Sequence, residues 1–242
     1  MSEISHIVRD QCKVSGPCRC RNQQVNRRAL WNLTSATSLA LVVIVACYFF
    51  VDRPVAFFVQ DHKLDQILWL KWLTFPPPMG QTWSPLVIGL VVIRRAWGPL
   101  ARWQHILFVA CVSLILADQF RESLGILCGR DWPETWHDNN PSLIGSGAYG
   151  FYPFSSGADV GSFPSGHAAR ILGFFSVWWI AMPRGRLLCA IIAVPMLVSL
   201  IGMNYHFVGD VIAGSFVGGI VGCYATQLGG LGSIANHITH AR

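Results

Sequence analysis

The chain has 242 residues and a formal net charge of +6, yet only 12% of its residues are charged and 52% are hydrophobic. An ordinary soluble domain carries about 25% charged residues, so this composition excludes that class and predicts an integral membrane protein. The apolar residues also form blocks long enough to cross a bilayer as helices, which takes roughly 20 residues each.

The N-terminal segment, residues 1–32, is polar and is expected to be a loosely ordered cytoplasmic tail. It is too long for a cleaved signal peptide, so the first span is expected to remain as a signal anchor. Residues 33–230 are predicted to form one all-α membrane domain, and residues 231–242 a cytoplasmic C-terminal tail. Six candidate spans lie in this domain: Thr34–Val51, Trp83–Trp97, His105–Leu127, His167–Met182, Leu187–Met203 and His206–Leu228.

Two connections between these spans have distinctive compositions. Arg53–Met79 mixes charged residues with aromatics, which is typical of a helix lying in the membrane interface near the path of a substrate. The prolines of Pro76–Pro78 are expected to end this helix. Gly129–Pro164 is long and rich in Gly, Pro, Ser and Asn, and its aromatics favour order, so it is predicted to be a functional lid.

The basic residues are concentrated in the segments that a cytoplasmic N-terminus places inside the cell. This asymmetry is the positive-inside signal. It predicts an inner-membrane protein with both termini in the cytoplasm and with Gly129–Pro164 on the periplasmic side. Because topology explains the basic charge, no nucleic-acid partner is expected.

The cysteines are expected to be free thiols. Three of them lie in the N-terminal tail, and the others lie in or near spans rather than in an outer loop, where a disulfide would be expected. The close pair Cys18 and Cys20 is alternatively a metal or lipid-attachment site, although no second ligand cluster lies nearby.

The segment from Phe163 to His167 lies where the long loop meets the fourth predicted span. Pro164 favours an extended residue before it, and Ser165 can cap the helix, which leaves the positive helix end facing the loop. Such a terminus binds phosphate. His167, in the first turn, is placed to donate a proton to a leaving oxygen.

A second motif, Asn204–Asp210, lies at the start of the sixth predicted span. His206 and Asp210 are four residues apart, so on a helix their side chains are neighbours. A carboxylate bonded to one ring nitrogen fixes the tautomer and leaves the other nitrogen free to attack. A lone interfacial histidine is usually a polar anchor, but both motifs reach the same outer face, and an intramembrane carboxylate is costly unless it is used. The motif predicts a nucleophile, His206, with Asp210 as its orienter.

Pro164-Ser165-Gly166-His167 and His206-x-x-x-Asp210, separated by two predicted spans, resemble the second and third signature motifs of the type 2 phosphatidic acid phosphatase superfamily. The resemblance runs from about Ala117 to Leu228. It implies a phosphatase that needs no metal and no cofactor, in which His206 forms a phosphohistidine, Asp210 orients it and His167 protonates the leaving group. Ser165 and the Gly166 backbone would hold phosphate oxygens.

The sequence departs from this family at three positions that are usually basic, which hold Gly125, Trp132 and Leu200. Arg130 is the nearest basic substitute and is therefore the expected phosphate-binding arginine, with Arg121 and Arg170 as the alternatives. Three glycines follow Asp210 at intervals of four: Gly214, Gly218 and Gly222. They favour close helix packing within the bundle, and a homodimer seam is the alternative.

We therefore predict an all-α, six-span phosphatase that hydrolyses a phosphomonoester or diphosphate of a membrane lipid at the outer face of the inner membrane. The missing basic residues leave open a non-catalytic phospholipid-binding or transport protein of the same fold, and a lipid phosphotransferase is a third reading. The sequence does not distinguish among polyprenyl diphosphate, phosphatidate, phosphatidylglycerol phosphate and a lipid A phosphate as the substrate.

Overall fold

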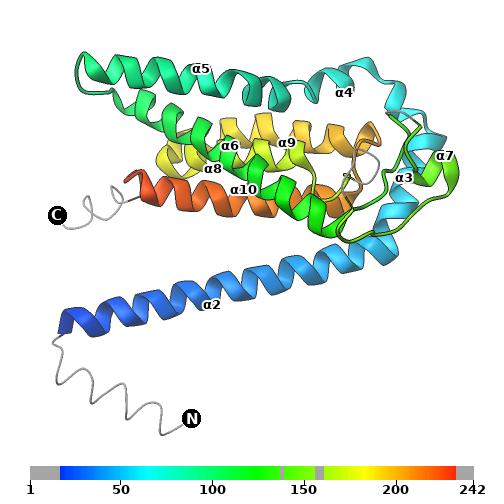
Figure 1. Cartoon of the computed structure of the whole chain (residues 1–242), viewed down its shortest axis with the longest axis horizontal. Helices are drawn as coiled ribbons and strands as arrows, with labels where there is room; N and C mark the ends of the chain where they lie inside the picture. The colour runs from blue at the N-terminus through cyan, green and yellow to red at the C-terminus, as the bar shows by residue number, and fades with distance from the viewer. Residues whose placement is uncertain (1–16, 137–138, 156–160, 233–242) are drawn as a thin grey trace, which may run out of the picture. The chain divides into compact units, whose positions relative to one another are not determined.

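A computed structural model describes residues 17–136, 139–155 and 161–232, with side chains described from residue 31 onward (Figure 1). These residues are helical apart from loops and isolated bridges, which confirms the all-α class for the described ranges. The chain divides into two compact units, Met1–Val43 and Ile44–Arg242. The domain boundaries expected at residues 32 and 230 remain predictions.

The first helix, α2 (Pro17–Ala46), begins well before the predicted span. The prediction of a loose tail up to residue 32 is therefore wrong from Pro17 onward. Polar residues such as Gln and Arg are good helix formers, so polarity alone does not prevent a helix. The chain continues through a π-helical turn, η1 (Cys47–Val51), into α3 (Asp52–Asp61).

The segment predicted to lie in the membrane interface forms α3, a short turn η2 (Leu64–Gln66) and α4 (Leu68–Leu73). Its aromatic residues Phe58, Trp69 and Trp72 are exposed, as expected for side chains that meet lipid headgroups. Pro76–Pro78 do not end a helix but begin α5 (Pro76–Ala96), which corrects the prediction. The first turn of a helix needs no backbone N–H donors, so prolines fit there.

The remaining long helices are α6 (Arg102–Cys128), α8 (Gly166–Ala181), α9 (Arg186–Gly202), which follows the turn η4 (Pro183–Gly185), and α10 (Val208–Leu228). Together with α5 they run alongside one another in Figure 1, and α8 contacts α5, α6, α9 and α10. A Cβ added to Gly214 would lie 2.2 Å from the Ser165 carbonyl oxygen, and one on Gly218 would lie 2.3 Å from that of Ala169. These glycines therefore allow α10 to pack closely on α8, which confirms their packing role within the bundle; the homodimer remains a prediction.

Four described segments are long and apolar enough to cross a membrane: Trp31–Asp61, Arg102–Cys128, Pro183–Gly202 and Val208–Leu228. The six predicted spans are therefore not confirmed. Of the other two, α8 has 16 residues and at 1.5 Å per residue is only about 24 Å long. The helix α5 has 21 residues, but prolines at its start and Arg94 and Arg95 at its end lower its hydropathy.

The long loop between α6 and α8 is ordered over its described residues. It contains a short helix, α7 (Leu143–Ser146), and isolated bridges from Arg130 to Phe151 and from Trp132 to Ser142. Leu143 packs with Ala56 of α3 and with Phe207 in a buried cluster. The loop is thereby held against the end of the bundle where α8 and α10 begin.

The five cysteines with described side chains, Cys47, Cys111, Cys128, Cys189 and Cys223, are free, as predicted. The side chains of Cys18 and Cys20 lie outside the described residues.

Candidate active site

The N-terminus of α8 has the predicted cap. The Ser165 hydroxyl accepts a hydrogen bond from the Ala168 backbone N–H at 3.3 Å, and Gly166 is the first helical residue. The Ser165 backbone N–H donates to the Asp210 carbonyl oxygen at 3.0 Å. The two motifs are therefore joined directly, although separate parts of the chain carry them.

His167 and His206 face each other at this junction. Their ring centroids are 5.8 Å apart. His206 is only 3% exposed, whereas His167 is partly exposed. The structure thus brings the predicted acid and the predicted nucleophile together, with His167 on the more accessible side.

The partner of the His206 ring differs from the prediction. Its Nδ1 atom lies 3.0 Å from the backbone carbonyl oxygen of Ser162. Because a carbonyl only accepts hydrogen bonds, Nδ1 carries the proton and Nε2 keeps its lone pair. The prediction that Asp210 bonds to the ring is wrong: α10 begins at Val208, so His206 precedes the helix and is not one helical turn from Asp210.

Asp210 instead accepts hydrogen bonds from residues that surround His206. Its Oδ2 accepts from the Ser162 hydroxyl at 2.6 Å and from the Phe207 backbone N–H at 3.1 Å, and its Oδ1 accepts from Arg130. Asp210 therefore fixes the residue whose carbonyl orients the histidine, and acts on the ring through Ser162.

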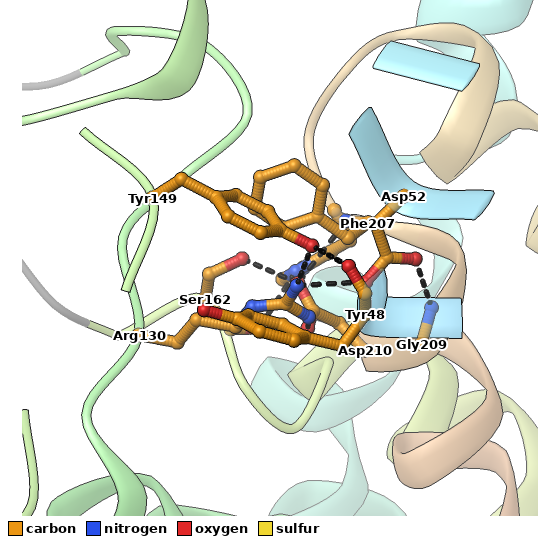
Figure 2. Close-up of polar contacts among 9 residues, drawn as sticks. Tyr48, Asp52, Arg130, Tyr149, Ser162, Phe207, Gly209 and Asp210 are labelled. Carbon is orange, nitrogen blue, oxygen red and sulfur yellow. Dashed lines mark hydrogen bonds and ion pairs between the residues drawn. The ribbon is translucent and has the colours of Figure 1, made fainter. Parts of the chain in front are cut away.

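Arg130 is buried, with 1% of its surface exposed. Its Nη1 donates to Asp210, while its Nη2 donates to Asp52 at 2.7 Å and to the Tyr149 hydroxyl at 3.1 Å (Figure 2). Burial alone would lower the pKa of Arg130, but the carboxylates of Asp210 and Asp52 outweigh it and raise that pKa. The phosphate-binding role of Arg130 stays a prediction; in this structure both of its terminal nitrogens bind protein groups.

Two other arginines lie beside the histidines. Arg121 donates from Nε to the Pro164 carbonyl at 3.1 Å, and a Cβ on Gly166 would lie 2.9 Å from that Nε, so the glycine lets the guanidinium approach the start of α8. Arg170 is paired with Asp118 at 2.7 Å. Burial lowers the pKa of His206 to about 3, and the positive charge of Arg121 contributes next.

Trp132 covers the buried histidine from the loop. Its ring centroid lies 5.4 Å from that of His206. This position agrees with the predicted lid, whose opening and closing remain a prediction.

A protein-family model matches the part of the chain that carries both motifs. The model of the PAP2 superfamily matches residues 106–230, about half of the chain. The chain belongs to the PAP2 superfamily. This membership confirms the resemblance read from the Ser165–His167 and His206–Asp210 motifs.

Two curated relatives of this PAP2 member are named lipid A 1-phosphatase. The protein from Rhizobium etli is 32% identical over 107 residues, which are 44% of this chain and 41% of the relative. The one from Rhizobium johnstonii is 29% identical over 110 residues, 46% of this chain and 41% of the relative. The matched region is less than half the length of either relative. No solved structure matches significantly.

Two site residues escaped the sequence analysis. Ser162 lies just before the Pro164–His167 motif, but nothing in the local sequence indicates that its carbonyl contacts a histidine 44 residues away. Asp52 lies outside the matched region, at the end of an apolar run. A carboxylate at the end of an apolar run usually marks the point where a helix leaves the membrane. An ionisable residue within the membrane is nevertheless a functional candidate.

Proposed function

We propose that this PAP2 member is an integral membrane lipid phosphatase that works through a phosphohistidine on His206. The observation that carries the proposal is the geometry of His206, whose Nδ1 bond to Ser162 leaves Nε2 as a lone-pair nucleophile beside His167. A binding protein has no use for a fixed, nucleophilic histidine tautomer facing a second histidine. The non-catalytic alternative is therefore disfavoured.

In the first step, Nε2 of His206 attacks phosphorus and the bond from phosphorus to the lipid oxygen breaks. His167 gives a proton to that leaving oxygen, so the lipid departs as an alcohol or, from a diphosphate, as a monophosphate. In the second step, water attacks phosphorus and the P–N bond breaks. His167 takes the proton from the water, and inorganic phosphate leaves with both histidines restored. A lipid phosphotransferase would follow the same first step, with another hydroxyl in place of water.

The nonbridging phosphate oxygens gain negative charge during the transfer and need positive groups aimed at them. The backbone N–H groups at the start of α8, next to Ser165 and Gly166, supply part of this charge. We assign the rest to Arg121 and Arg170 in place of Arg130, because their side chains are 16% and 15% exposed although they pair with Glu122 and Asp118, whereas that of Arg130 is 1% exposed. Arg121 lies at the Pro164 carbonyl and against Gly166 at the start of α8, and Arg170 follows His167 by one helical turn.

An apolar cavity supports a lipid substrate. It has a volume of about 500 Å³ and lies among α5, α6, α8 and α9, with lining residues that include Gly80, Phe174, Ile192 and Arg170. Arg170 follows His167 by one helical turn and is the charged residue in this lining. We place the hydrocarbon chain in the cavity and the phosphate at its Arg170 end. The names of the relatives make a lipid A phosphate the first substrate to test.

The finer membrane topology is part of this proposal. We infer that α5 and α8 cross the membrane with the four longer segments, because both pack within the bundle formed by α6, α9 and α10. We place the protein in the inner membrane with both termini on the cytoplasmic side. The loop that contains Trp132 is then periplasmic. Asn139 in this loop is exposed, so a cysteine placed there should react with an impermeant reagent in cells whose outer membrane alone is permeable. Labelling only after the inner membrane is opened would refute this topology.

A phosphate-release screen tests the activity. Purified protein is incubated with lipid A phosphate, phosphatidate, phosphatidylglycerol phosphate and undecaprenyl diphosphate, with and without a chelator. We expect release from at least one lipid, insensitivity to the chelator, and no release by His206→Ala. Wild-type protein that matches His206→Ala on every lipid would refute the phosphatase, and phosphate appearing only on an added lipid acceptor would favour the transferase.

A further inference from the structure

Asp52 is a buried carboxylate that takes no part in the proposed reaction steps. It is the first residue of α3, directly after the π-helical turn, and 1% of its surface is exposed. It lies outside residues 106–230, the part that matches the family model. A buried charge of this kind is costly unless it is paired and hydrogen-bonded.

Asp52 is bonded at both oxygens to groups beside the active site. Its Oδ2 accepts from Arg130 Nη2 at 2.7 Å, and its Oδ1 accepts from the Gly209 backbone N–H at 2.9 Å (Figure 2). Gly209 immediately precedes Asp210 in the first turn of α10. A Cβ on Gly209 would lie 3.1 Å from Oδ2 of Asp52, so this position favours the residue without one.

A continuous set of contacts leads from Asp52 to the nucleophile. Arg130 connects Asp52 to Asp210, Asp210 accepts from the Ser162 hydroxyl, and the Ser162 carbonyl accepts from His206. Four aromatic rings surround the guanidinium within 5.4 Å of its central carbon, namely those of Tyr48, Tyr149, Phe151 and Phe207. Each link is charge-assisted or buried, which favours a single geometry.

We propose that Asp52 is a positioning residue for His206. By holding Arg130 and the first turn of α10, it fixes Asp210 and, through Ser162, the ring orientation that aims Nε2 at phosphorus. The helix that contains Asp52 thus contributes to catalysis although it lies outside the matched region. The proposal rests on the proposed function, since it concerns the same nucleophile.

The test measures kcat and KM of Asp52→Asn on the lipid that the wild type hydrolyses best, with Asp61→Asn, an exposed residue at the end of the same helix, as the matched control. Asn keeps the size of Asp52 and an oxygen for the Gly209 N–H, but loses the charge that holds Arg130. We expect kcat to fall at least about tenfold, because a small displacement of a catalytic group is enough for such losses. KM should stay within about twofold, since phosphate binding is assigned elsewhere.

A double-mutant cycle separates positioning from structural support. Ser162→Ala removes the hydroxyl link but keeps the carbonyl that bonds to His206. If Asp52 acts through this link, the loss in kcat of the double variant will be clearly smaller than the product of the two single losses. If Asp52→Asn does not fold, Gly209→Ala, whose methyl group crowds the same carboxylate, replaces it in the cycle.

Wild-type kcat in the folded Asp52 or Gly209 variant, or losses that multiply, would overturn the proposal. Lower thermal stability with unchanged kcat would overturn it as well. Failure of the proposed function looks different, because the wild type and Asp61→Asn would then release no more phosphate than His206→Ala.

Discussion

The Nδ1 atom of His206 lies 3.0 Å from the carbonyl oxygen of Ser162, and this contact sets the tautomer of the ring. The bond joins a side chain to the backbone, and the carboxylate of Asp210 holds the Ser162 residue that supplies the carbonyl. In the proposed mechanism, protonation of Nε2 would remove the lone pair that attacks phosphorus.

The first prediction concerns pH. Burial, followed by the charge of Arg121, lowers the pKa of His206 from 6.5 to about 3. Protonation of His206 removes the lone pair of Nε2. Because the pKa of His206 is lowered, its ring stays neutral and nucleophilic as the pH falls below 6.5. The acid limb of kcat/KM that belongs to His206 should lie near 3. The ionisation of the lipid phosphate is measured separately by ³¹P NMR and divided out; a remaining acid limb near 6.5 would show that His206 is not buried and neutral.

The second prediction concerns Arg121 and Arg170. Removing one preorganised donor from a charged transition state typically costs about a hundredfold or more. We expect Arg121→Ala and Arg170→Ala each to lower kcat/KM by about that factor, with Arg121→Lys recovering only part, because lysine lacks the planar fork. Arg184→Ala, at an exposed turn, is the control. If both alanine variants keep wild-type activity, the phosphate-binding assignment fails.

The third prediction concerns Arg130, which lies between the carboxylates of Asp52 and Asp210. Arg130→Ala leaves both without their cation, and breaking a buried pair in this way costs about 3–5 kcal/mol. The variant should melt at a clearly lower temperature than the wild type or than Arg95→Ala, an exposed control. Arg130→Lys should recover only part of the loss, since one ammonium cannot bridge both carboxylates as the guanidinium does. Wild-type melting with a much higher KM would restore the phosphate-binding role first expected for Arg130.

The fourth prediction concerns the apolar cavity. Ile192→Trp adds bulk to its lining, whereas Leu188→Trp changes an exposed position of the same helix outside the lining. If the hydrocarbon chain of the substrate lies in the cavity, Ile192→Trp should raise KM about tenfold for a long-chain lipid phosphate, because apolar burial contributes about 0.8 kcal/mol per methylene. A short-chain analogue should be little affected. Equal effects of both tryptophans, or on both chain lengths, would place the chain elsewhere.

Local chemistry explains what the sequence could predict. A serine before the first turn of a helix readily caps it, so the Ser165 cap could be predicted from the local sequence alone. The pairing of His167 with His206 followed from the alternation of spans. The glycines of α10 were readable for the same reason, since their spacing alone puts them on one face.

Long-range contacts explain what it could not. The hydrogen-bond acceptor for His206 is a backbone carbonyl 44 residues away. Every residue has such a carbonyl, so the amino-acid type does not indicate which one is the acceptor. Arg130 was assigned to phosphate by closeness in sequence, whereas its direction is set by Asp52, 78 residues away. The count of six spans is not confirmed at α8, because the helix, Gly166–Ala181, agrees with the predicted span His167–Met182 but its 16 residues are short for a membrane crossing.

The most direct test of the central claim is to trap the covalent intermediate. The protein is mixed with a lipid carrying ³²P in the phosphate to be removed, quenched in alkali, which preserves phosphohistidine, and digested for peptide mapping. We expect the label on the peptide that contains His206 in the wild type and none on it in His206→Ala, whose turnover should also be lost. Turnover by His206→Ala, or a label that maps to another residue, would contradict the mechanism.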